Sequence, residues 1–152
     1  LKGMKENPII MKSITDDKYW NGIVVIGTHK KPKSSFSNVV IRDLRNVDTN
    51  KWRQTGGIVF YRSDVKIVNL TIQNAYSEDA LNVIDSRFQI ENIFIKDTSS
   101  DAVDIDFSDG YIFASQFENI GHDGGGDAID VSGSYLKLDK IQFISYTIVL
   151  KS

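Results

Sequence analysis

One five-residue phrase recurs in this chain and constrains its fold more than any other feature. Two copies read Asp-Ala-hydrophobic-Asp-hydrophobic, and a third reads Asp-Ala-Leu-Asn-Val. The copies begin at Asp79, Asp101 and Asp127, so they lie 22 and 26 residues apart. A repeat of this length predicts one structural unit that stacks on its neighbours, because a single unit cannot bury its apolar face alone.

The segments between the copies indicate an all-β chain. Short runs rich in Ile, Val and Phe alternate with polar residues and are broken by Asn, Asp, Ser and Gly, and no helical periodicity is sustained. Residues 38–46 resemble residues 64–72, and residues 56–60 and 22–26 take the place of the phrase in earlier coils. A second apolar column keeps the same spacing, at Ile67/Leu70/Ile72, Ile90/Ile93/Ile95, Ile112/Ser115/Phe117 and Leu138/Ile141/Phe143.

Coils of about 22 residues with two or three short strands predict a parallel β-helix, a solenoid whose stacked coils share one core. Leucine-rich repeats have a similar period, but their fixed leucine pattern and their helical half are absent. A sandwich or barrel needs hairpin turns between neighbouring strands, and such turns occur only at Asn21-Gly22 and Asp109-Gly110, at repeat boundaries or corners. The solenoid is therefore the predicted architecture.

Polar residues mark the predicted corners and loops of the coils. Segments 28–36 and 48–57 are expected to leave the coil body as loops, and residues 7–13 and 20–23 are expected to form an earlier, longer coil. A stacked polar column at one register suits a corner, because Asn and Asp favour bends, tolerate a left-handed backbone and can bond side chain to backbone along the stack. Its members are Asn74, Asp97, Asn119 and Ser145.

Length, charge and composition narrow the classes of function. The chain of 152 residues suits one domain, 1–152, and its net charge of −2 provides no polybasic surface for nucleic acid. The absence of cysteine excludes disulfides and thiolate metal sites, and no apolar run is long enough to span a membrane. The chain opens without Met and ends on an apolar run, so we expect a segment of a longer solenoid or multidomain protein, flanked by further coils or caps that protect its strand edges.

Alternation assigns the two faces of the phrase strands. Leu81 and Val83, with their counterparts in the following coils, should point inward. On the outward face, Asp104 and Asp130 share a register, so adjacent coils should bring them to roughly 4.8 Å. Asp106 lies two residues along the same face. Asp104, Asp106 and Asp130 are called the carboxylate strip below.

The carboxylate strip has three possible roles. It can be a solvated acidic surface that keeps the stack soluble. Stacked like charges repel unless a cation intervenes, and Ca²⁺ takes six to eight oxygen ligands, so Asp104, Asp106 and Asp130 are candidate calcium ligands. The same three carboxylates, with His122, are also candidate catalytic or sugar-contacting groups.

Residues beside the strip complete the candidate site. The leading aspartates, Asp79, Asp101 and Asp127, stand at the turn into each strand, where Asx-type bends favour a structural role. The glycine-rich loop 121–126 accounts for the longer spacing of 26 residues, and glycine permits close approach of a ligand. This loop carries His122, a candidate acid or base near the strip.

Exposed aromatic side chains would mark a platform for sugar rings. Periodicity alone does not separate such platforms from aromatic residues that pack between coils. The candidates are Tyr61, Tyr76, Tyr111, Tyr135 and Tyr146, with Trp20 and Trp52 in or near the early loops.

The order of these features resembles a known superfamily. The opening, with Leu1-Lys2-Gly3, Asn7-Pro8-Ile9-Ile10 and Trp20-Asn21-Gly22-Ile23, is similar to the leading coils of bacterial secreted β-helix proteins. Residues Gly126–Ser134 (GDAIDVSGS) resemble a phrase of bacterial surface proteins. Nearly the whole chain resembles a right-handed, single-stranded parallel β-helix of the pectin-lyase-like superfamily. The resemblance implies an extracellular or cell-surface location in a bacterium.

The resemblance leaves two classes of function, because this fold hosts enzymes and adhesins alike. Gly121-His122-Asp123 only partly matches the Gly-His-Gly motif of polygalacturonases, and Arg87 and Lys137, the nearest bases by register, lie in no lyase motif. The first hypothesis is therefore an extracellular scaffold or carbohydrate-binding module whose partner is a polysaccharide. The alternative is a polysaccharide lyase or glycoside hydrolase that uses the carboxylate strip.

Overall fold

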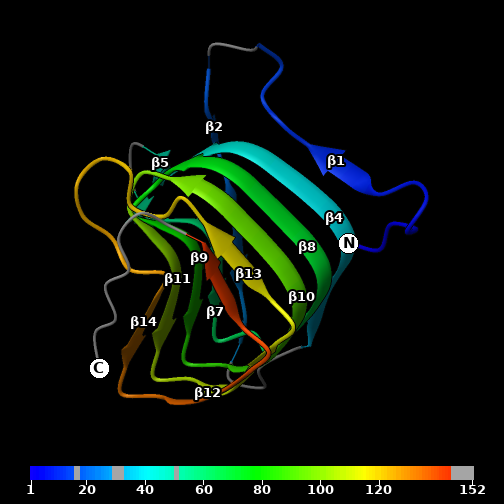
Figure 1. Cartoon of the computed structure of the whole chain (residues 1–152), viewed down its shortest axis with the longest axis vertical. Coiled ribbons are helices and arrows are strands. Elements are labelled where there is room, and N and C mark those ends of the chain that lie inside the picture. Colours follow the sequence, from blue (N-terminus) through cyan, green and yellow to red (C-terminus); the bar gives the residue numbers. More distant parts are fainter. Residues whose placement is uncertain (16–17, 29–32, 50–51, 145–152) are drawn as a thin grey trace.

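The chain is wound into a parallel β-solenoid. The computed structural model describes residues 1–15, 18–28, 33–49 and 52–144, and in this part of the chain it contains strands and no helix. About five turns stack along the axis in sequence order, about 25 residues apart (Figure 1). No helix long and apolar enough to cross a membrane occurs among these residues. The all-β solenoid predicted from the repeat is confirmed.

Two parallel sheets form the walls of the solenoid, and a short hairpin lies between β4 and β7 in the chain. The nine-stranded sheet contains β1 (Ile9–Met11), β2 (Trp20–Asn21), β4 (Ser34–Arg45), β8 (Val65–Tyr76), β10 (Arg87–Thr98), β12 (Asp109–Phe113), β13 (Gln116–Glu118), β15 (Tyr135–Asp139) and β16 (Gln142–Ile144). The five-stranded sheet contains β3 (Ile23–Ile26), β7 (Gly56–Tyr61), β9 (Asp79–Ile84), β11 (Asp101–Asp106) and β14 (Ile129–Ser132). The antiparallel hairpin pairs β5 (Val47–Thr49) with β6 (Trp52–Gln54).

Strand pairing confirms the register predicted for the central coils. Leu81 pairs with Val103, and Val103 pairs with Ile129, so the phrase copies lie directly beside one another. The second apolar column is paired in the same way, from β8 through β10 and β12 to β15. The spacing between paired residues is therefore 22 here and rises to 26 where the loop 121–126 lengthens the coil.

The register of β4 differs from the prediction. Val39 pairs with Leu70 and Ile41 pairs with Ile72, an offset of 31 residues. Comparison of residues 38–46 with residues 64–72 had implied an offset of 26. The hairpin β5–β6 lies between β4 and β8 and lengthens this coil, and a comparison that assumes a nearly constant coil length does not detect such an insertion.

Two predicted loops are shorter than expected. β4 begins at Ser34, so the end of the first loop belongs to the nine-stranded sheet, and residues 29–32 lie outside the described part of the chain. The second loop is the β5–β6 hairpin, and Gly56 already opens β7. The expected early coil is confirmed by β1, β2 and β3, which pair with β4 and β7.

The core follows the solenoid axis. Leu81, Val83, Val103 and Ile105 are fully buried, as the alternation predicted. Burial of one such side chain contributes about 1.5–3 kcal/mol to folding. Because each coil adds its own inward residues, the core grows with every turn and no single coil could form it alone.

Left-handed residues form the predicted polar corner. Asn74, Asp97 and Asn119 have φ angles of 57°, 56° and 52°. The amide Nδ2 of Asn119 donates a hydrogen bond to Oδ1 of Asp97 at 2.8 Å, so the column is linked from side chain to side chain. Its fourth predicted member, Ser145, lies outside the described residues.

A second ladder of the same kind was not predicted. Asn38, Asn69 and Asn92 also have positive φ, between 51° and 56°. The amide of Asn69 donates to Oδ1 of Asn38 at 2.8 Å, and the amide of Asn92 donates to Oδ1 of Asn69. Asn is among the few residues that adopt this backbone at low cost, and its short amide reaches the next coil.

Candidate functional site

The carboxylate strip lies on the outer face of the five-stranded sheet. Asp104 of β11 pairs in register with Asp130 of β14, and Asp106 pairs with Ser132. The strip aspartates are partly exposed, while Val103 and Ile105, which alternate with Asp104 and Asp106, are buried. The structure therefore brings Asp104, Asp106 and Asp130 to one face, as the alternation predicted.

Asn82 extends this register but is buried. It is only 4% exposed, although its parity places it on the same outer face. Its amide Nδ2 donates to Oδ2 of Asp104 at 3.0 Å and to Oδ2 of Asp79 at 3.2 Å. The Asn82 side chain thus ties the strip to the leading aspartates.

The leading aspartates hold the turns into the phrase strands. Asp79 and Asp127 are 3% and 2% exposed. Oδ1 of Asp101 accepts a hydrogen bond from the backbone N–H of Asp127 at 2.7 Å, which links consecutive coils. Thr55 donates to Asp79 at 3.2 Å. These contacts support the structural role expected for the column, and they also bring its carboxylates next to the strip.

Burial and crowding raise the proton affinity of two carboxyls in this region. Burial, together with the negative charges of Asp79, Asp106 and Asp130, raises the pKa of Asp104 to about 8. Burial is also the largest cause that raises the pKa of Asp79, to about 6. Asp104 therefore keeps its proton at neutral pH and can donate it, which is the property that a general acid requires.

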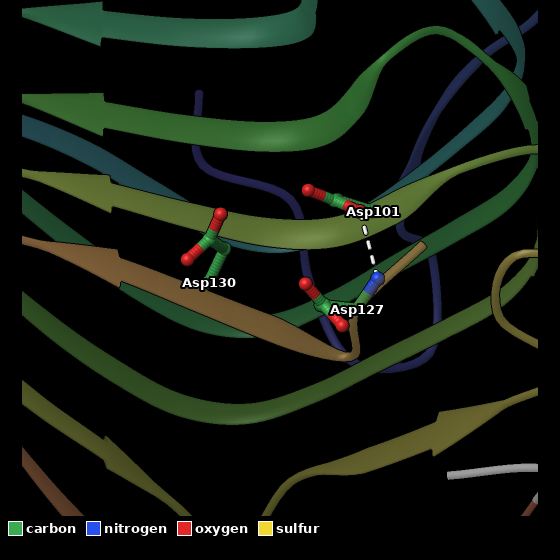
Figure 2. A group of neighbouring side chains, drawn as sticks. All are labelled: Asp101, Asp127 and Asp130. Atoms are coloured by element: carbon green, nitrogen blue, oxygen red, sulfur yellow. Dashed lines mark hydrogen bonds between the residues drawn. The ribbon is translucent and has the colours of Figure 1, made fainter. Parts of the chain in front are cut away.

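The carboxylates that converge on one point are not those expected from the sequence. Oxygens of Asp101, Asp127 and Asp130 all lie within 4.8 Å of one another (Figure 2). Asp101 opens β11, Asp127 lies in the turn before β14, and Asp130 lies in β14. Only Asp130 belongs to both this trio and the carboxylate strip. Three carboxylates can begin a shell for Ca²⁺, which takes six to eight oxygens. Melting the protein with added calcium and with a chelator tests whether either set binds the ion.

His122 does not join the strip. Its Nδ1 lies 2.8 Å from Oδ1 of Asp123, its own neighbour in the loop 121–126. The loop is fastened to the end of β10, because Thr98 accepts the N–H of His122 through its carbonyl and the N–H of Gly121 through its hydroxyl. The structure thus pairs His122 with Asp123 and shows no bond to the strip among the described residues.

A second candidate site lies on the nine-stranded sheet, just past the corner where each coil leaves the five-stranded sheet. A hollow of about 610 Å³ opens on the outer face of the nine-stranded sheet, beside β8, β10, β12 and β15. Its lining includes two of the tyrosines singled out above as possible sugar platforms. We call it the tyrosine groove and define it by Lys33, Lys66, Arg87, Tyr111, Tyr135 and Lys137.

Hydrogen bonds fix the wall of the tyrosine groove. Nε and Nη2 of Arg87 donate to Oδ2 of Asp64 at 3.0 and 2.8 Å, and the backbone N–H of Arg87 donates to Oδ1 of Asp64 at 2.9 Å. The hydroxyl of Tyr111 donates to Glu91 at 2.6 Å, and this bond is the main cause that raises the pKa of Tyr111. Both side chains are therefore held in place before any ligand arrives.

The other aromatic candidates lie elsewhere. Tyr61 is 40% exposed at the end of β7, and Tyr76 packs against Tyr19 with ring centroids 5.2 Å apart. Nε1 of Trp20 donates to the carbonyl of Arg42 at 2.6 Å. Tyr146 lies outside the described residues, as does the side chain of Trp52.

The spacing of the repeat already aligns the residues that line the tyrosine groove. Arg87, Asp109 and Tyr135 share one register, and Tyr111 shares another with Lys137. The spacings of 22 and 26 residues align these positions, but no sequence motif joins them. Their proximity becomes evident only when each coil is wound onto the next.

Comparison with known proteins adds no family to this description. The chain matches no protein-family model, no curated protein and no solved structure at a significant level.

Proposed function

We propose that this chain is a carbohydrate-binding solenoid module of a bacterial surface or secreted protein. The observation that carries the proposal is the tyrosine groove, where Tyr111 and Tyr135 line a hollow of about 610 Å³ on a rigid sheet. Aromatic faces carry partial negative charge and attract the C–H face of a sugar ring. Resemblance of the opening coils and of residues 126–134 to bacterial secreted and surface proteins supports the location.

Binding to a panel of neutral and acidic polysaccharides tests the proposal. We expect measurable binding that falls about tenfold in Tyr135→Ala, because one exposed ring would be lost from the site. Tyr61→Ala is the matched control, since Tyr61 is exposed but lies outside the groove. A protein that binds no member of the panel, or equal losses in both variants, would contradict the proposal.

A second candidate function is hydrolysis or lyase cleavage of a polysaccharide at the carboxylate strip. The observation that favours it is the pKa of Asp104, about 8, beside Asp106 and Asp130. Paired carboxyls with separated pKa values are the arrangement that glycoside hydrolases use as general acid and base. In a hydrolase scheme Asp104 donates the proton to the leaving oxygen while Asp130, its register partner on the next coil, attacks the anomeric carbon. Asp104, now ionised, then activates the water that hydrolyses the glycosyl-enzyme bond.

Turnover assays on the same panel separate the two functions. If the protein releases reducing ends and Asp104→Asn does not, the result would contradict the binding-module proposal and support the enzyme. Binding without turnover supports the module. Tyr135→Ala adds an independent check, because it should weaken binding at the tyrosine groove and leave turnover at the carboxylate strip unchanged.

A further inference from the structure

We propose that the tyrosine groove selects an anionic oligosaccharide, a stretch of glycan whose sugars carry carboxylate or sulfate groups. This inference rests on the proposed carbohydrate-binding function and names the ligand class. The groove begins at the corner that follows the five-stranded sheet, since β11 ends at Asp106 and β12 begins at Asp109. It is therefore a surface separate from the carboxylate strip.

Cations outnumber carboxylates around the groove. Its lining holds two acidic residues, Asp64 and Asp109, and Glu91 beside it pairs with Lys66 at 3.8 Å, so four cations face three carboxylates in a chain whose net charge is −2. The local positive charge therefore opposes the sign of the molecule, and an anionic ligand is attracted to this face more than to the rest of the surface. The four cationic residues in the lining are Lys33, Lys66, Arg87 and Lys137.

The two carboxylates of the lining are already engaged. Asp64 is 8% exposed and accepts three hydrogen bonds from Arg87. Oδ1 of Asp109 accepts the backbone N–H of Tyr135 at 3.2 Å. The Arg87 side chain remains 76% exposed, and its guanidinium has five N–H donors, of which Asp64 takes two. Arg87 is thus held in one orientation and keeps donors for a ligand.

Lys137 is the cation best placed to select an acidic sugar. It lies in register with Tyr111 and two residues after Tyr135 on the same strand, so it is a neighbour of both tyrosines. It also borders a second hollow of about 380 Å³, which continues past Tyr111 to Phe113. Among the described residues Lys137 forms no ion pair. Its ammonium group can therefore meet the charge of a ligand without breaking an existing contact.

The aromatic rings are spread along the groove and are not stacked on each other. Tyr111 and Phe113 are two residues apart on one face of β12, and Tyr135 lies diagonally across on the next coil. Diagonal neighbours of this kind lie roughly 7–8 Å apart. This arrangement suits an extended chain of sugar rings, each of which can lie on an aromatic face while its acidic group meets Arg87 or Lys137. Lys66 is already paired with Glu91.

The test compares acidic glycans with their own neutral derivatives. Each carboxylated glycan is paired with its carboxyl-reduced form and each sulfated glycan with its desulfated form, and binding to the whole chain is measured by calorimetry at low and high salt. We expect the acidic member of at least one pair to bind about tenfold more tightly, with affinity that falls as salt rises. The pair that responds shows whether carboxylate or sulfate is preferred.

Two variants locate the effect. Lys137→Gln should weaken binding of the acidic glycan about three- to tenfold and leave any binding of its neutral derivative unchanged. Lys96→Gln is the matched control, because Lys96 lies on β10 outside the groove. Tyr135→Ala should weaken binding of both members of the pair.

Three results would overturn the inference. If the neutral derivatives bind as tightly as the acidic glycans, the ligand class is wrong and the carbohydrate-binding module still stands. If no glycan binds, the module fails as well. If single-stranded DNA or polyglutamate binds as tightly as the acidic glycans, with no loss in Tyr135→Ala, the groove is a general anion surface and selects no sugar.

Discussion

Single asparagines set the geometry of each corner. Asn69 has φ of 56°, donates to Asn38 and accepts from Asn92. Two physical effects therefore meet at this residue: a left-handed backbone, which costs most side chains about 1–2 kcal/mol, and two hydrogen bonds between coils, each of which contributes about 1 kcal/mol. Substitutions can separate the two effects.

Asn69→Ala should lower the free energy of unfolding by about 3–4 kcal/mol, because it loses both hydrogen bonds and strains the backbone. Asn69→Gly should lower it by only about 2 kcal/mol, since it loses the hydrogen bonds but adopts positive φ freely. Urea unfolding of both variants measures the difference. Equal losses would show that the backbone conformation contributes little at this corner.

Asp104 and Asp79 should make stability depend on pH. Their pKa values in the folded chain, about 8 and about 6, lie above the ordinary value of 3.8. The folded chain then binds more protons than the unfolded chain between pH 3.8 and about 8. Their contribution is fully favourable below pH 3.8, declines as pH rises through this window and levels off above it.

Asp104→Asn should remove the loss of stability that occurs in the upper part of this pH range. At pH 8 we expect the variant to be more stable than the parent by about 1–3 kcal/mol, because no charge is forced into the crowded strip. Thermal melts from acid to alkaline pH measure the effect. Asp139→Asn is the control, since Asp139 is exposed on β15. A parent-like pH profile for Asp104→Asn would contradict the raised pKa.

At the scale of strands, close packing between coils depends on one small residue beside the tyrosine groove. Gly110 of β12 pairs with Phe88 of β10. A Cβ added at Gly110 would collide with the carbonyl oxygen of Phe88 and lie 2.7 Å from its Cγ. Because the carbonyl oxygen belongs to the backbone of Phe88, rotation of the Phe88 side chain would not relieve the collision.

Gly110→Ala should therefore destabilise the protein by about 1–3 kcal/mol through overpacking. Gly125→Ala is the matched control, because a Cβ at Gly125 meets nothing within 4 Å. Urea unfolding compares the two. A Gly110→Ala variant as stable as the control would mean that β10 and β12 can separate at low cost.

At the scale of the whole molecule, the central coils differ from the coil of β14, β15 and β16, the last that the structure describes. β14, β15 and β16 each pair with one strand only among the described residues, whereas β8 to β11 are paired on both sides. Leu138 of β15 is 44% exposed, but its counterparts Ile90 and Ile112 are fully buried. A solenoid is stabilised by contacts between neighbouring repeats, so a coil with one neighbour is the weaker unit.

Amide hydrogen exchange should show this gradient. We expect β14, β15 and β16 to exchange at least about tenfold faster than β9 and β10, since local opening of an edge coil breaks fewer contacts. Mass spectrometry of peptic fragments resolves these segments. Uniform protection along the chain would instead indicate that all coils open together.

Spacing and alternation along the chain are enough to specify the coil and its inward and outward faces. Period and alternation are local properties, so Leu81, Val103 and Asp104 could be assigned to their faces and registers from spacing alone. The left-handed corner at Asn74 and Asp97 was accessible for the same reason, because the conformational preference belongs to the residue type.

Tertiary structure alone decided how far β4 is shifted against β8, which carboxylates converge and where the cations meet the tyrosines. The shift of β4 depends on the inserted β5–β6 hairpin, which a regular period does not reveal. Asp101 and Asp127 approach Asp130 because the chain bends at the turn into each strand, and alternation does not describe a bend. The tyrosine groove joins residues from five consecutive coils, and only the stacking of those coils gives Lys137 and Tyr111 a common surface.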